Sequence, residues 1–138
     1  MHRATFIALG LLLLVAHTAD ACPRARPEPF AKFLSQFTQS IDFAVSRTSF
    51  PLQATKLDVH ANPEPAARSF KLTRKAFKNR GTISVQSQQD GLKMRQQALG
   101  QNTAAVHVYK PDTGWLVVYH FHLQDNCWRL RQVDDEST

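Results

Sequence analysis

The sequence predicts an α+β domain in which N-terminal helices pack on a curved antiparallel sheet. Apolar residues recur at helical spacing from Phe30 to Ile41, and the C-terminal part of the chain contains two hairpins whose turn residues fix their registers. An amphipathic helix and a sheet with one apolar face must each bury the apolar surface against another element. We therefore expect the helices and the sheet to bury those faces against each other, in one domain spanning residues 30–138.

The first 21 residues have the pattern of a secretory signal peptide. Arg3 precedes an apolar run from Phe6 to Ala16, and the small residues Ala19 and Ala21 follow. A membrane anchor would need about 20 apolar residues, which is more than this run supplies. The pattern predicts a signal peptide at 1–21 and a periplasmic or secreted protein.

Cleavage after Ala21 would leave Cys22 at the mature N-terminus, which raises two uses for this cysteine. One is a lipid anchor, although Ala19 and Asp20 fit the usual lipoprotein motif poorly. The other is a disulfide with Cys127, because an even cysteine count in an exported chain indicates pairing. We favour the disulfide and keep the lipid as the alternative.

The predicted elements follow in order along the chain. Residues 22–29 contain three prolines and form an extended leader. After the first helix, Ser40 or Asp42 can cap a short second helix that ends before Pro51. The further elements predicted from the pattern are a strand at Leu52–Val59, a helix at Leu72–Arg80 stopped by Gly81, a strand at Thr82–Ser87 and, less clearly, a strand within Asp90–Gly100.

Turn residues set the registers of the two final hairpins. Pro111 to Gly114 form the first loop, in which we expect the glycine to take a positive φ. Asp125 and Asn126 form the second, two-residue turn. The resulting cross-strand pairs are Lys110 with Trp115, Val108 with Val117, Val106 with Tyr119, Leu123 with Trp128 and Phe121 with Leu130.

Alternation then divides the side chains of this sheet between two faces. The inner, apolar face includes the candidate pocket residues Trp115, Tyr119, Phe121 and Trp128. The outer face places His122 opposite Arg129 and His120 opposite Arg131. The two arginines, and the lack of Asp, Glu or Cys on this face, disfavour a metal site. We therefore expect the outer face to be solvated, to contact an anion or a partner, or to be covered at Leu116 and Val118 by a second subunit.

The chain carries a formal net charge of +6, and one segment concentrates it. The basic segment has no acidic residue and comprises Arg68, Lys71, Arg74, Lys75, Lys78 and Arg80. For an exported chain the expected targets are an acidic protein surface, an anionic envelope polymer or lipid headgroups, and not nucleic acid. The alternative is a solvated helix face without a partner.

Two stretches resemble a known group of proteins. "FAKFLSQFTQSIDFAVSRTSFPL" (Phe30 to Leu52) and the closing "YHFHLQDNCWRLRQVDDES" look like a family of uncharacterised exported bacterial proteins with the cone-shaped fold of nuclear transport factor 2, which scytalone dehydratase and ketosteroid isomerase share. The middle, Thr55 to Gly100, matches only in the order of its elements. The resemblance implies this fold and an envelope location, and it implies no agreed activity.

Catalysis in such a cone needs a buried acid or histidine near neutrality. The predicted register places only Tyr119 inside, while Asp58 points outward, and no nucleophile motif is present. We therefore expect a non-catalytic binding protein without a cofactor, as an immunity-type inhibitor of a toxin or as a binder of another protein. The alternative is a small apolar ligand binder, or an isomerase-like or dehydratase-like enzyme, that uses the cone pocket.

Overall fold

The computed structural model describes residue 22 and residues 24–83 and 90–138. The predicted signal peptide and most of the predicted strand at Thr82–Ser87 lie outside the described residues. The elements are α1 (Phe30–Gln39), α2 (Ile41–Ser46), β1 (Thr48–Asp58), β2 (Ala66–Leu72), α3 (Arg74–Asn79), β3 (Lys93–Ala98), β4 (Thr103–Tyr109), β5 (Leu116–Gln124) and β6 (Cys127–Asp135).

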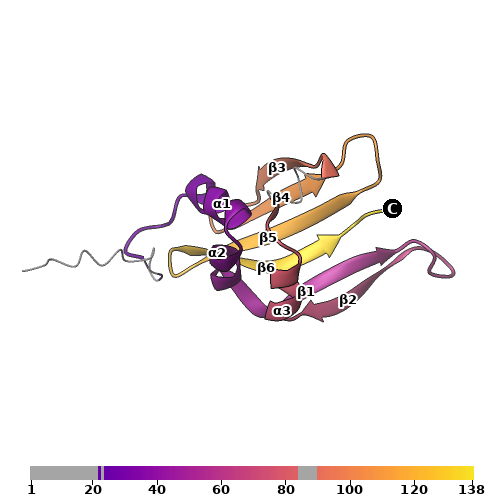
Figure 1. Ribbon diagram of the computed structural model, residues 1–138, viewed down its shortest axis with the longest axis horizontal. Coiled ribbons are helices and arrows are strands. Elements are labelled where there is room, and N and C mark those ends of the chain that lie inside the picture. The colour runs from indigo at the N-terminus through magenta and orange to yellow at the C-terminus, as the bar shows by residue number, and fades with distance from the viewer. Residues whose placement is uncertain (1–21, 23, 84–89) are drawn as a thin grey trace, which may run out of the picture.

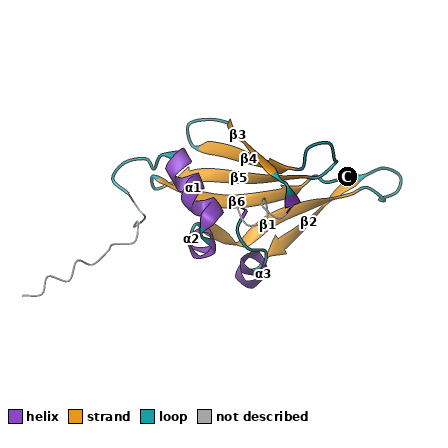
Figure 2. Cartoon of the chain, turned by 45° about the horizontal axis from the view of Figure 1, so that its top comes forward, coloured by secondary structure: helices purple, strands orange, loops and turns teal. Residues whose placement is uncertain are grey.

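The six strands form one sheet in the order β2-β1-β6-β5-β4-β3, and the helices lie against one of its faces (Figures 1 and 2). The prediction of helices packed on a curved sheet is thus confirmed. The sheet is mixed rather than fully antiparallel, because β1 and β6 run parallel. These two strands are far apart in the sequence, and no turn joins them that would reveal their direction.

Helices α1 and α2 form where the apolar spacing places them. Phe33 and Phe37 on α1 are buried, and their rings lie 5.5 and 5.1 Å from the ring of Phe121 on β5. The hydroxyl of Ser40 accepts a hydrogen bond from the backbone N–H of Phe43, so Ser40, one of the two predicted caps, is the cap of α2. Close aromatic packing therefore joins the helical layer to the centre of the sheet.

Strand β2 was not predicted, because its residues are exposed except for Leu72 and show no apolar alternation. The helix that we expected at Leu72–Arg80 is shorter. It begins after Thr73, whose side chain caps α3, and it ends before Gly81, which has a φ of 75°. The basic segment thus divides between an edge strand and a short helix.

Strand β1 begins at Thr48, four residues before the predicted start at Leu52. The register of β1 against β6 is interrupted between Thr48 and Gln53. Pro51 lies in this interruption, where its missing N–H breaks no regular ladder. The prediction treated Pro51 as a boundary, and the structure accommodates it inside the strand.

Both hairpin registers are confirmed near their turns. Val108 faces Val117, and Leu123 faces Trp128. Asp125 and Asn126 have φ angles of 51° and 62°, as a two-residue turn requires. In the first loop the positive φ belongs to Asp112, at 59°, and not to Gly114 as expected.

Gly114 is needed for another reason. A Cβ atom at this position would lie 2.8 Å from the carbonyl oxygen of Thr138 and would collide with the Thr138 hydroxyl. The C-terminal residues pass directly over this loop, and the N–H of Thr138 donates to the carbonyl of Gly114. The glycine therefore permits a close approach of backbone to backbone.

A β-bulge in β6 changes which side chains reach each face. Phe121 pairs with Leu130, but His120 pairs with Gln132, so Arg131 is the extra residue. The predicted pairing of His120 with Arg131 is therefore wrong. Beyond the bulge the alternation is reversed, and Val133 and Asp135 take the inner face while Gln132 and Asp134 take the outer face.

Candidate functional site

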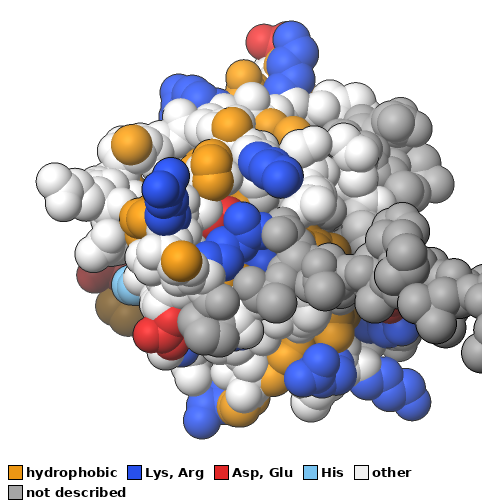
Figure 3. Space-filling model, turned by 90° about the vertical axis from the view of Figure 1, so that its left-hand side faces the viewer, with side chains coloured by type: hydrophobic (Ala, Val, Ile, Leu, Met, Phe, Trp, Pro, Cys, Tyr) orange, Lys and Arg blue, Asp and Glu red, His pale blue; other side chains and the backbone are white. Residues whose placement is uncertain are grey.

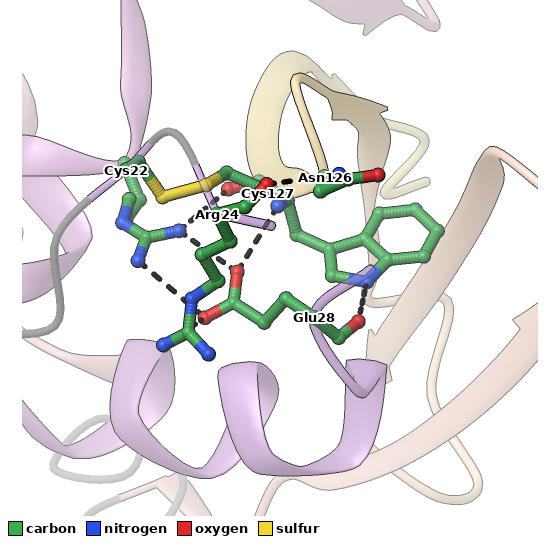
Figure 4. Close-up of a disulfide and its surroundings, with 7 residues drawn as sticks. Cys22, Arg24, Glu28, Asn126 and Cys127 are labelled. Atoms are coloured by element: carbon green, nitrogen blue, oxygen red, sulfur yellow. Dashed lines mark hydrogen bonds and ion pairs between the residues drawn. A yellow bond between two sulfur atoms is a disulfide. The ribbon is translucent and has the colours of Figure 1, made fainter. Parts of the chain in front are cut away.

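The predicted disulfide between Cys22 and Cys127 is present, with a Cα–Cα distance of 6.1 Å. It joins the leader to the start of β6 (Figure 4). The leader also bonds to the preceding turn, because the N–H of Glu28 donates to the carbonyl of Asn126 over 2.9 Å. Residues 24–29 are therefore held along the β5–β6 hairpin.

Glu28 lies in the core with an exposed fraction of 3%, and the sequence analysis did not single it out. Its Oε2 lies 2.8 Å from Nη1 of Arg47 and accepts a hydrogen bond from the backbone N–H of Trp128. Its carbonyl accepts a second bond, from the indole N–H of Trp128. Every named contact of this carboxylate is structural, so Glu28 fastens the leader to α2 and β6.

Cys22, Glu28 and Cys127 are the one group of potential metal ligands that lie close together in the described part of the chain. The two sulfur atoms are bonded to each other, and the carboxylate is paired with Arg47. In this oxidised state neither sulfur is a thiolate that could ligate a metal.

The predicted pocket residues do not line a common pocket. Phe121 and Trp128 are buried within the core, whereas Trp115 is only half-buried near the end of the sheet. Beside Tyr119, between the helices and the sheet, the described residues enclose a space of about 20 Å³. A space of that size holds one water molecule at most.

Tyr119 is on the inner face as predicted. Burial raises the pKa of Tyr119 to about 12, the nearby charge of Arg80 opposes this rise, and the charge of Asp135 adds to it. Burial thus keeps the phenol in its neutral form well above physiological pH.

Two acids lie on the inner side of the sheet, contrary to the predicted register. Asp135 arrives there through the bulge, beside Val117 and opposite Lys56 on β1. Asp58 shares its side of β1 with the buried Leu52 and Ala54, and not an outward side as predicted. Asp58 pairs with Arg68 at 2.7 Å.

The outer face contains a hydrogen-bonded cluster centred on Asp134. One of its oxygens lies 2.8 Å from Nε2 of His120, and Thr55 and Gln132 both donate to the carboxylate. Burial alone would raise the pKa of Asp134, but the bonds from Gln132 and Thr55 and the proximity of His120 hold it below its usual value. The expectation that this face lacks an acid is therefore wrong.

The other predicted residues of the outer face are more exposed. His122 lies opposite Arg129, which confirms that pair. Arg131 projects at the bulge, and its guanidinium donates to the side-chain oxygen of Gln124 over 2.7 Å. Some polar side chains of this face, such as those around Asp134, thus bond to each other.

The residues of the basic segment have different surroundings. Lys78 pairs with Asp42 at 3.0 Å, and the guanidinium of Arg74 lies 5.0 Å from the ring centre of Phe50. Arg68 is bound to Asp58, and Arg80 lies beside the interior space next to Tyr119. Lys71 and Lys75 are exposed and form no ion pair with another described residue.

Basic side chains also occur at the end of the molecule where the leader and helices lie. Figure 3 shows them dispersed around this end, with apolar side chains between them. The net charge is therefore not confined to the basic segment.

An open space lies at the opposite end, between the β1–β2 hairpin and the C-terminal residues. Its volume is about 830 Å³, and Lys56, Phe70 and Trp115 are among the residues that line it. We call it the hairpin groove. Sequence reasoning missed it, because it is formed where two distant parts of the chain diverge.

Comparison with solved structures identifies the architecture. The chain is similar to an NTF2-like protein from Bacteroides fragilis, with a TM-score of 0.63 and 14% identity over 83% of this chain. The chain has the NTF2-like fold. It spans about half of that protein, since the match covers 50% of the B. fragilis chain.

The chain is also similar to two further solved structures. A protein from Bacteroides uniformis has a TM-score of 0.51 and 20% identity, over 80% of this chain and 78% of its own. An NTF2-like protein of unknown function from Pseudomonas putida has a TM-score of 0.43 and 12% identity, over 76% and 81%. No family model matches the NTF2-like chain, and no curated protein is similar to it in sequence.

Two findings bear on location. The disulfide is consistent with an oxidising compartment. In the described part of the chain, no helix has both the length and the apolar character needed to cross a membrane.

Proposed function

We propose that this chain is a non-catalytic binding protein of the bacterial envelope whose partner is a protein with an acidic surface. The observation that carries the proposal is the distribution of space. The interior beside Tyr119 has room for about 20 Å³, whereas about 830 Å³ lies open at the surface. Among the described residues, the larger space thus lies open at the end of the sheet away from the helices, and the space beside Tyr119 is small.

The engagement of the acidic and histidine side chains supports the same reading. Glu28 is paired with Arg47, Asp58 with Arg68, and Asp134 with His120. A general base needs to reach a substrate, and these groups are directed to neighbouring side chains instead.

The acidic character proposed for the partner rests on cations that form no ion pair within the described part of the chain. Lys71 and Lys75, together with Arg74, form an exposed basic corner at the junction of β2 and α3. Complementary charge across an interface speeds association and selects the partner.

The narrower form of the proposal is an immunity-type inhibitor that blocks a toxin acting in the envelope. A small exported module that presents charge suits this role, in which binding alone is the function. Expression of the chain should then protect cells from a toxin with an acidic face, and protection should be lost in the variant described next.

The first experiment is native mass spectrometry of the protein isolated from the envelope of its own host. A retained protein partner supports the proposal, and a retained small molecule in its place contradicts it. The decisive variant is Lys71→Glu with Lys75→Glu, since neither side chain has an ion pair with another described residue to lose. We expect it to weaken partner binding at least about tenfold, the effect of losing close charge pairs.

The matched control is Lys93→Glu with Lys110→Glu. It makes the same change in net charge, but Lys93 lies on β3, at the opposite edge of the sheet from β2. Equal losses in the two double variants would show a general charge effect and would remove the basic corner from the proposal.

A further inference from the structure

The hairpin groove exists because β1 has neighbours of unequal length. Its pairing with β2 continues to Asp58, opposite Ala66, whereas its pairing with β6 ends at Lys56, opposite Asp135. After Asp135 the chain turns away, and the N–H of Glu136 donates to the carbonyl of Leu116 on β5. The hairpin and the C-terminal end therefore diverge (Figure 1).

This divergence leaves an open strand edge inside the groove. Past Lys56, no described strand pairs with the side of β1 that faces away from β2. The open edge comprises Leu57 and Asp58, and the carbonyl of Asp58 already accepts a bond from the N–H of Ala61. An extended chain can add to the main-chain groups that remain.

Apolar side chains lie next to this edge. Phe70 and Val59 are exposed at 39% and 38%, and both line the groove. They are two of the four large apolar side chains that are exposed in the described part of the chain. Trp115 lines the same space from the β5 side, so one apolar side chain of a bound segment can be covered there.

The charged side chains of the groove differ in whether they already form an ion pair. Asp58 is neutralised by Arg68 at 2.7 Å. Lys56 is exposed and forms no ion pair with another described residue. Asp135, opposite Lys56 on β6, also lines the groove, but no ion pair joins the two side chains. An acidic side chain of a bound segment can therefore pair with Lys56.

The shape of the groove favours a chain segment over a small molecule. A ligand pocket usually surrounds most of its ligand, and this space is an open groove. An extended segment can bind in such an open groove, because its main-chain hydrogen bonds to a strand edge do not require the protein to surround it.

We infer that the hairpin groove binds an extended segment of a protein partner, which adds a strand to β1, covers an apolar side chain against Phe70 and Trp115, and pairs an acidic side chain with Lys56. The inference rests on the proposed function and names a second contact with the same partner. The basic corner then attracts the partner, and the groove holds its extended segment.

The test uses the disulfide-bonded protein and synthetic nine-residue peptides. Each peptide has a Thr and Ser background with one Leu and one Glu at varied positions. We expect at least one peptide to bind with a Kd below 1 mM, an order-of-magnitude threshold for weak recognition, and to slow hydrogen exchange at Leu57 to Val59. N-methylation of its central amides should weaken binding about tenfold or more, because it removes main-chain donors.

Charge exchange supplies the matched control. Lys56→Glu should weaken the Glu peptide about tenfold and restore binding of the corresponding Lys peptide. Lys93→Glu, which makes the same charge change on β3, should leave both affinities unchanged. Phe70→Ser tests the apolar contact at an exposed position and should also weaken binding.

Three results would overturn the inference. The first is that no peptide binds with a Kd below about 1 mM, the threshold given above. The second is protection from hydrogen exchange at sites outside the groove. The third is that Lys56→Glu and Lys93→Glu change the affinity for the Glu peptide equally. If the protein binds the fatty acid laurate in the groove and binds no peptide, the inference is also overturned. If the intact partner binds through Lys71 and Lys75 but ignores Lys56→Glu, the groove inference fails while the proposed function stands.

Discussion

Tyr119 has surroundings that disfavour its ionised form, which makes it a reporter of the interior. Its pKa of about 12 exceeds the ordinary value of 10.0 mainly because of burial. A group whose pKa is raised by folding contributes stability that is complete below the unfolded pKa. This stability is lost as the pH rises from about 10 through about 12.

We expect the absorbance of tyrosinate to show a step at about pH 12 in the folded protein. The chain has two tyrosines, so single variants assign the step. Tyr119→Phe should abolish it, and Tyr109→Phe should retain it. Tyr119→Phe should also reduce the fall in unfolding free energy between pH 10 and 12. A step at about 12 that survives in Tyr119→Phe would show that the phenol is not the buried group.

The β-bulge in β6 decides which acid faces each side of the sheet. Deleting Arg131 removes the extra residue and keeps Val133 and Asp135 on the inner face. We expect this deletion to cost about 1 kcal/mol, as for a typical surface change. Denaturant unfolding measures the cost.

Deleting Arg131 and Gln132 together has a different consequence. The remaining strand then alternates in the opposite phase, so Val133 turns to the outer face and Asp134 turns into the core. We expect a loss of at least about 3 kcal/mol, because a charge is buried without its partners. Equal costs for the two deletions would contradict the assigned phase.

The same bulge explains where sequence reasoning succeeded and where it did not. Turn residues such as Asp125 and Asn126 fixed the register next to the hairpin, because a two-residue turn permits one pairing. Nothing in the sequence around Arg131 marks an extra residue, so the prediction continued in phase and placed Arg131 opposite His120.

Strand β2 escaped prediction for a related reason. Its residues are exposed, so they carry no period-two pattern. Pairing with β1 stabilises it, and that pairing is a tertiary property. The hairpin groove depends on the same strand together with the distant C-terminal residues, and it could not be inferred locally.

At the scale of the whole molecule, a disulfide and a buried carboxylate are two of the contacts that hold the leader to the last hairpin. The disulfide links residues 105 positions apart, and Glu28 reaches Arg47 and Trp128 in the core. The disulfide acts chiefly on the unfolded chain, by reducing its entropy. The carboxylate acts on the folded chain, because its charge is buried with that of Arg47.

Because the disulfide and the carboxylate stabilise the fold by different mechanisms, variants can separate their effects. Cys22→Ser with Cys127→Ser should lower the unfolding free energy by about 4 kcal/mol, as expected for a loop of this length. The leader should stay in place, so the N–H of Glu28, which donates to Asn126, should remain protected from hydrogen exchange relative to the exposed leader.

Glu28→Gln should also destabilise the protein, by about 3 kcal/mol, because the buried charge of Arg47 loses the opposite charge of the Glu28 carboxylate. In the variant that also lacks both cysteines, the leader should detach and the protection at position 28 should disappear. Asp42→Asn, which breaks the exposed pair with Lys78, is the matched control and should cost about 0.5 kcal/mol or less. If removing the disulfide alone released the leader, Glu28 would not be an independent tie, and a covalent bond would be the main reason that the N-terminal segment belongs to the fold.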